Sequence, residues 1–124
     1  MQITTFNPQI VTQDAEAAAA FFEELGFERR HDREEVGELG VRGIRMKNAD
    51  GFYLDISQPP GLELPDMVAI RINVRDFDEA FELLRARGFE NVYGDGRVET
   101  ESSRSAFLIS PTGFGVNLIE HIRR

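Results

Sequence analysis

The chain has 124 residues, which fits one domain, and its 41% apolar residues and ten phenylalanines are enough to build a hydrophobic core. Its formal net charge of −8 opposes binding to nucleic acid, because affinity for the phosphate backbone comes from lysine and arginine. The absence of cysteine excludes disulfides, thiolate metal sites and cysteine nucleophiles. The sequence shows neither a long apolar run nor a basic region followed by an apolar stretch, so we expect a cytoplasmic protein without a membrane span.

The first half of the chain predicts a strand, a helix and three further strands. A strand over residues 7–12 is weakly indicated, because Pro8 favours a strand start or edge. A helix follows over 14–28, with Asp14 suited to the N-cap and Gly26 to the position after the last turn. Its predicted buried stripe consists of Ala17 or Ala18, Phe21 and Leu25. The strands that follow are expected at 27–33, 41–48 and 52–57, with a turn at 48–51.

The second half predicts the same order of elements. In the strand 68–74, Val68, Ile70, Ile72 and Val74 are expected on one face and Ala69, Arg71 and Asn73 on the other. The helix over 76–90 begins at Asp76 and ends at Gly88. Its predicted buried stripe consists of Phe77, Ala80, Leu83 and Leu84. Four strands are expected at 89–93, 97–101, 105–110 and 115–121, with a turn at 110–113.

The two halves are related by a constant offset. Asp14 and Asp76 lie 62 positions apart, and the same shift superposes Gly26-Phe27-Glu28 on Gly88-Phe89-Glu90 and Gly51-Phe52 on Gly113-Phe114 without a gap. An internal repeat explains this register better than chance does. We therefore predict an α+β fold of two βαβββ modules in a single domain. The first module covers 1–57, a linker covers 58–66, and the second module covers 67–124.

One face of the strands in each module is expected to pack under its helix, and the other faces are expected to line a shared cup. A concave surface with a few polar groups is the usual form of a ligand site. The residues predicted to line it are Asn7, Gln9, Arg45, Tyr53, Asp55, Ala69, Arg71, Asn73, Phe107 and Asn117. Asp55 has two interpretations: a general base, or one half of an ion pair with Arg45 or Arg71.

These motifs resemble the glyoxalase/bleomycin-resistance/ring-cleaving dioxygenase superfamily, also called the vicinal oxygen chelate superfamily. Asp14…Phe21-Phe22…Leu25-Gly26-Phe27 is similar to the first-helix motif of that family. Asp76…Gly88-Phe89, followed by Ser110-Pro111-Thr112-Gly113, is similar to its second-module helix and turn. The resemblance covers essentially the whole chain. It implies a cupped mixed sheet and a homodimer, with the pairing of modules within or across chains left open.

The resemblance also locates the positions that hold a divalent metal in metal-dependent members. By register these are Asn7, Asp55, Ala69 and Asn117, which offer one carboxylate, two amides and no donor at Ala69. Zn²⁺, Ni²⁺ and Fe²⁺ prefer imidazole and carboxylate ligands, so a metal cofactor is disfavoured. His31 and His121 are expected on the surface, away from the cup faces of these strands.

The leading interpretation is a metal-independent small-molecule binder, similar to the bleomycin-resistance members. Tyr53 and Phe107 would stack on the ligand or pack at an interface. Asp55 would suit a cationic ligand, whereas Arg45 and Arg71 would suit an anionic one, so the charge of the ligand is open. One alternative is a lyase, isomerase or dioxygenase whose metal ligands lie elsewhere. Another is an interaction or sensing module without catalysis.

Overall fold

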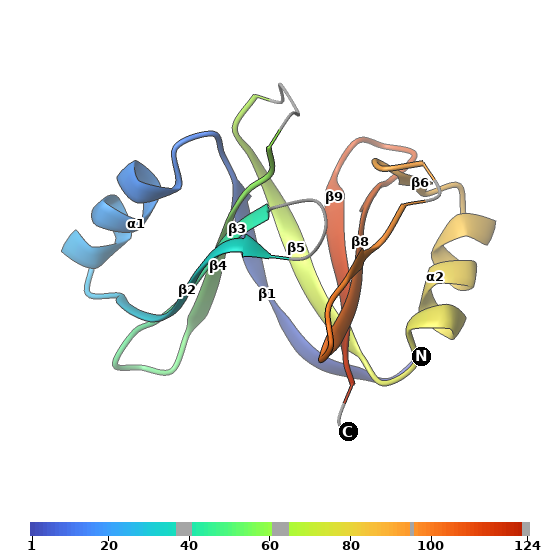
Figure 1. Ribbon diagram of the computed structural model, residues 1–124, viewed down its shortest axis with the longest axis horizontal. Coiled ribbons are helices and arrows are strands. Elements are labelled where there is room, and N and C mark those ends of the chain that lie inside the picture. The colour runs from blue at the N-terminus through green and yellow to red at the C-terminus, as the bar shows by residue number, and fades with distance from the viewer. Residues whose placement is uncertain (37–40, 61–64, 95, 123–124) are drawn as a thin grey trace. The chain divides into compact units, whose positions relative to one another are not determined.

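The computed structural model describes residues 1–36, 41–60, 65–94 and 96–122, and for 33–36 it describes the backbone alone. The expected α+β class with two βαβββ modules is confirmed (Figure 1). The chain forms two compact units. The N-terminal unit is Asn7–Val68, and the C-terminal unit combines Met1–Phe6 with Ala69–Arg124. Part of the predicted linker, residues 61–64, lies outside the described residues.

The N-terminal unit contains a mixed sheet in the order β2-β3-β4-β1. Its elements are the part of β1 (Ile3–Val11) that begins at Asn7, α1 (Ala15–Glu24), β2 (Glu28–Val36), β3 (Val41–Lys47) and β4 (Tyr53–Gln58). β1 runs parallel to β4, while β2–β3 and β3–β4 are antiparallel. The pairing of β1 with β4 covers Gln9 to Val11 and so begins after Pro8, which has no N–H to donate.

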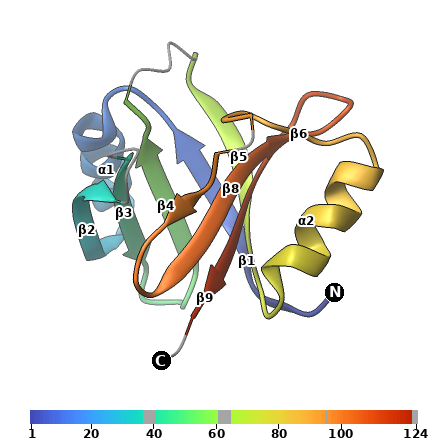
Figure 2. The same cartoon turned by 45° about the vertical axis from the view of Figure 1, so that its right-hand side comes forward.

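The C-terminal unit repeats this arrangement with strand order β5-β9-β8-β6. Its elements are the part of β5 (Met67–Val74) that begins at Ala69, α2 (Phe77–Ala86), β6 (Glu90–Asn91), β7 (Val98–Glu99), β8 (Ser103–Ile109) and β9 (Gly115–His121). β5 runs parallel to β9, and β8 pairs antiparallel with β9, β6 and β7. In both cartoon views α2 lies beside β8 and β9 (Figure 2). The predicted strands at 89–93 and 97–101 shrink to two residues each.

Strand pairing confirms the register of the repeat. Asp55 on β4 lies between Gln9 on β1 and Arg45 on β3. Its counterpart Asn117 on β9 lies between Arg71 on β5 and Phe107 on β8. Each of these pairs of equivalent positions is separated by the offset that relates Asp14 to Asp76.

Each helix covers a separate hydrophobic core. Beneath α1 the core consists of Ala15, Ala19, Ile44, Met46, Leu54 and Ile56. Beneath α2 it consists of Val74, Phe77, Ala80, Phe81, Ala106, Leu108, Val116 and Leu118. The buried residues that the helices contribute are Ala15 and Ala19 from α1, and Phe77, Ala80 and Phe81 from α2.

Both helices begin at the predicted N-caps, but they end at Glu24 and Ala86, short of the expected ranges 14–28 and 76–90 and just before the predicted glycines. The carboxylates of Asp14 and Asp76 accept hydrogen bonds from the backbone N–H of Ala17 (3.1 Å) and Glu79 (3.2 Å), respectively. After each helix a glycine adopts a positive φ, +96° at Gly26 and +89° at Gly88, a conformation that costs side-chain-bearing residues energy.

The predicted buried faces are partly wrong. Phe21 is 55% exposed and Leu25 58%, because the face that meets the sheet is set one position away, by Ala15, Ala19 and Phe22. Leu83 is likewise exposed, and Phe81 takes its place in the core. Val68, which was expected on the same face as Ile70, Ile72 and Val74, is 64% exposed. A one-position error in helical phase is enough to exchange a buried for an exposed residue.

Candidate functional site

A row of polar residues crosses the face of the N-terminal sheet that points away from α1. Gln9, Asp55, Arg45 and His31 are successive cross-strand partners on β1, β4, β3 and β2. Their side chains share a face because Ile44, Met46, Leu54 and Ile56, at the alternate positions, are buried under α1. The strand pairing therefore brings together residues from three consecutive strands and from β1, which is distant from β4 in sequence.

Asp55 is the centre of this row. It is only 6% exposed, and its Oδ2 accepts hydrogen bonds from Asn7 Nδ2 (2.8 Å) and Arg45 Nη1 (2.6 Å). A buried carboxylate requires such compensation, since an uncompensated charge in the interior is very costly. Asp55 is therefore one half of an ion pair with Arg45, which is one of the two interpretations given by the sequence. Gln9, also buried, donates from Nε2 to the hydroxyl of Ser57 at 3.0 Å.

Asn7 has an unusual hydrogen-bonding state. Its Nδ2 donates to the carbonyl of Pro8 (2.9 Å) and to Asp55 (2.8 Å), which fixes the orientation of the amide. Its Oδ1 is buried and has no hydrogen-bond partner among the described residues. An unsatisfied buried acceptor costs about 1–3 kcal/mol, so an atom of this kind calls for an explanation.

Tyr53 lies next to two cations. The guanidinium carbon of Arg45 is 4.2 Å from the ring centroid, and the Nζ of Lys47, its partner across the β3–β4 pair, is 5.1 Å away. Tyr53 itself is 37% exposed, so its ring is accessible. Lys47 was not among the predicted site residues. Its position two residues after Arg45 on a strand, and hence on the same face, was the available signal.

The remaining predicted residues lie in the C-terminal unit. Arg71 donates from Nε to Oδ1 of the buried Asn73 at 3.0 Å. His121 Nε2 lies 3.4 Å from Arg71 Nη2, so the expectation that no histidine approaches these strand faces is wrong. The period of two that places Asn117 and His121 on one face of β9 was the missed signal.

Phe107 packs on the neighbouring strand. A Cβ added at Gly115 would lie 2.6 Å from its Cζ and 3.2 Å from the Cβ of Ala69. The ring of Phe107 therefore lies directly against Gly115, within its own unit. Its direct cross-strand partner is Asn117.

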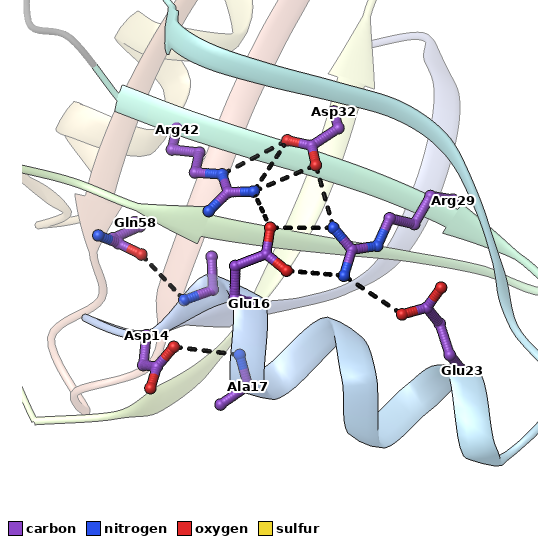
Figure 3. A network of polar contacts seen from close by, with 9 residues as sticks. Asp14, Glu16, Ala17, Glu23, Arg29, Asp32, Arg42 and Gln58 are labelled. Carbon is purple, nitrogen blue, oxygen red and sulfur yellow. Dashed lines mark hydrogen bonds and ion pairs between the residues drawn. The ribbon is translucent and has the colours of Figure 1, made fainter.

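The opposite face of the N-terminal sheet, toward α1, carries a network of surface charges. Glu16 of α1 lies between the guanidinium groups of Arg29 and Arg42, and Asp32 contacts both arginines (Figure 3). Hydrogen bonds from Arg29, and then Arg42, lower the pKa of Glu16 to about 2. The network ties α1 to β2 and β3, and its acidic groups are already paired with arginine.

The residues at the expected metal positions do not fit a divalent metal. Asp55 supplies the one carboxylate of the set, and the same oxygen that would bind a cation is 2.6 Å from the Arg45 guanidinium. Ala69 offers no donor atom. Within the described part of the chain, no group of three or more histidine, cysteine, aspartate or glutamate side chains has the geometry of a metal site.

A recess on the C-terminal unit is the other candidate. It is lined by Phe81, Glu82, Arg85 and Arg97, none of which the sequence singled out. Arg97 stacks on Phe81 (4.8 Å to the centroid) and pairs with Asp78 at 3.5 Å, so its charge is compensated.

Neither helix among the described residues is long and apolar enough to span a membrane.

Comparisons with known proteins extend over almost the whole chain. A family model described as "Glyoxalase/Bleomycin resistance protein/Dioxygenase superfamily" matches residues 3–118. A search of curated proteins found no match. A solved methylmalonyl-CoA epimerase is 20% identical, with 99% of each chain covered and a TM-score of 0.69.

Two further solved structures are similar. A variant of the Streptomyces coelicolor methylmalonyl-CoA epimerase, in complex with 2-nitronate-propionyl-CoA, is 24% identical and has a TM-score of 0.67, with 96% of this chain and 98% of that chain covered. A superfamily member from Vibrio splendidus is 13% identical and has a TM-score of 0.60, with 96% of this chain and 99% of that chain covered. At these identities the likeness establishes the fold alone.

Proposed function

Because the chain belongs to the glyoxalase/bleomycin resistance protein/dioxygenase superfamily, we propose that it binds a small molecule without the help of a divalent metal, on the polar row of the N-terminal unit. The supporting observation is the state of Asn7 and Asp55. Asp55 is compensated by Arg45, whereas the buried Oδ1 of Asn7 lacks a partner among the described residues. A buried acceptor without a partner is a cost to folding that a ligand donor can remove.

Metal independence is proposed from the donor set. A metal at this position would have to displace Arg45 from Asp55 and would gain at most one carboxylate and an amide. Elemental analysis of the purified protein is expected to show far less than one equivalent of Zn, Ni, Fe, Co or Mn. An equimolar metal whose removal by a chelator abolishes ligand binding would contradict this part of the proposal.

Ligand binding is tested by a thermal-shift screen of organic acids, amines and neutral aromatic compounds. A ligand stabilises the protein in proportion to the logarithm of its concentration over Kd, so even weak binders are detected at high concentration. The variant Asn7→Leu, which removes the buried acceptor without a partner, should reduce the shift, whereas Asp78→Asn on the exposed surface of the C-terminal unit should leave it unchanged. Identical shifts in both variants would refute the assignment of the site.

A second candidate function is isomerisation of an acyl-CoA, favoured by the recurrence of methylmalonyl-CoA epimerases among the similar structures. Epimerisation next to a carbonyl group requires removal and return of a proton on the α-carbon. Incubation of methylmalonyl-CoA with the protein in D₂O, followed by mass spectrometry, measures this exchange directly. Exchange above the buffer background that Asp55→Asn abolishes would favour the isomerase, and exchange at the background rate would exclude it for this substrate.

A further inference from the structure

The polar row of the N-terminal unit has an excess of positive charge, although the chain as a whole is acidic. Arg45 and Lys47 flank Tyr53, and the carboxylate that faces them, Asp55, is already paired with Arg45. Glu28, which lies opposite Lys47 across the β2–β3 pair, contacts Arg30 at 3.8 Å instead. Lys47 forms no ion pair with any side chain that the structure describes.

Arg45 has unused hydrogen-bonding capacity. Its guanidinium carries five N–H groups in a planar fork, and among the described residues it donates from Nη1 alone, to Asp55. Its side chain is 19% exposed, so part of the fork is sheltered while remaining accessible. A planar fork of this kind matches the geometry of a carboxylate or phosphate.

Arg45 and Lys47 require an acceptor on the ligand, whereas Asn7 requires a hydrogen-bond donor. Both N–H groups of its amide are engaged, and the remaining atom, the buried Oδ1, can only accept a hydrogen bond. A ligand that satisfies it must therefore carry a donor, such as a hydroxyl or an ammonium group. The same Asp55 oxygen connects Asn7 to Arg45, so donor and anion sites lie next to each other.

We propose that the ligand of this site is a small organic anion whose carboxylate or phosphate binds Arg45 and Lys47 and whose hydroxyl or amino group donates to Asn7 Oδ1, with an apolar part against Tyr53. This inference rests on the proposed function and decides the charge of the ligand, which the sequence left open. A hydroxy acid with an aromatic side chain meets all three requirements.

Four aromatic probes of similar size separate these requirements in calorimetric titrations. Phenyllactate carries a carboxylate and a hydroxyl, hydrocinnamate lacks the hydroxyl, the methyl ester of phenyllactate lacks the charge, and phenethylamine reverses it. We expect phenyllactate to bind most tightly, hydrocinnamate about tenfold more weakly, and the ester and the amine more weakly still. If phenethylamine bound preferentially and Asp55→Asn abolished that binding, the proposed negative charge of the ligand would be wrong, although the binding site would still be supported. No binding by any probe class would overturn both.

Three variants connect the result to the named side chains. Lys47→Met should weaken binding of phenyllactate and hydrocinnamate equally, by about three- to tenfold, since it removes one charge contact. Asn7→Leu should remove the preference for phenyllactate over hydrocinnamate. Arg75→Gln, an exposed position in the C-terminal unit, changes the net charge by the same amount as Lys47→Met and should have no effect. Equal effects of Lys47→Met and Arg75→Gln would overturn the proposal.

The wild-type protein provides a second readout that needs no substitution. Lys47 is the only lysine in the sequence, so reductive methylation with carbon-13-labelled formaldehyde labels this side chain and the N-terminal amine alone. Phenyllactate should shift the dimethyl-lysine NMR signal in a saturable way, and phenethylamine should not. A Lys47 signal that stays in place when phenyllactate is saturating would overturn the proposed contact even if Asn7→Leu failed to fold.

Discussion

Removal of the Arg45 side chain tests the central ion pair of the site. In the variant Arg45→Met, Asp55 stays 94% buried by its neighbours but loses the guanidinium 2.6 Å from its Oδ2. Loss of one partner from a buried pair costs about 3–5 kcal/mol, because the other charge remains in the interior. Asn7 still donates to Asp55 at 2.8 Å, so we expect the variant to lose about 3 kcal/mol of unfolding free energy, at the lower end of this range.

A double-mutant cycle isolates the pair. Asp55→Asn should cost less, about 1–2 kcal/mol, because the partly exposed Arg45 can reach solvent. The double variant should be more stable than the sum of the two single effects predicts, by at least about 1 kcal/mol. Urea unfolding at neutral pH, followed by circular dichroism, measures all four free energies of unfolding.

A surface pair in the same unit serves as the control. Arg30 and Glu28 lie 3.8 Å apart with side chains 52% and 77% exposed, so Arg30→Met should change stability by no more than about 0.5 kcal/mol. The coupling of Arg45 with Asp55 should also persist in moderate salt, since sheltered pairs are weakly screened. If Arg45→Met cost no more than Arg30→Met, the interpretation of Asp55 as a buried, compensated charge would be wrong.

Four other measurements test separate features. Arg29 and Arg42 lower the pKa of Glu16 from 4.5 to about 2, so the stabilising effect of Glu16 is complete above pH 4.5 and is lost as the pH falls toward 2. The difference in melting temperature between wild type and Glu16→Gln should therefore disappear over that range. A difference that stays constant would count against the network. Asp76→Ala should lower the stability by about 1 kcal/mol through loss of the α2 N-cap, and an unchanged urea midpoint would contradict this. Gly115→Ala should cost about 1–3 kcal/mol by collision with Phe107, and Phe107→Leu in the same chain should recover part of the loss. Light scattering should give twice the 14.0 kDa mass of the chain if the expected homodimer forms, and a 14.0 kDa species would reject it.

The helix ends and the repeat could be predicted because they depend on local chemistry. Asp14 and Asp76 cap their helices through hydrogen bonds to residues three positions ahead. Gly26 and Gly88 adopt a positive φ where other residues would be strained. These effects act within one or two turns of chain, so the residue types alone carry them.

The buried faces were less predictable, because they depend on the partner surface. Phe21 and Ala19 are both apolar and close in sequence, yet Ala19 is buried and Phe21 is 55% exposed. Ala19 lies on the face of α1 that packs with Ile44 and Met46 of β3, whereas Phe21 lies outside that core. A sequence pattern gives the period of a helix, whereas the phase of its buried face is set by packing.

For the site, the sequence by itself determined the candidate strands and face, including Asn7, Arg45, Tyr53 and Asp55. Only the tertiary structure decided what those residues do to one another. The pairing of Asp55 with Arg45 and the position of Lys47 beside Tyr53 depend on the register of β3 with β4, and the state of Asn7 depends on a contact with Asp55, 48 positions away in the chain. The net charge of the site is what remains after its charged side chains have paired, and the number of acidic and basic residues in the sequence does not give this value.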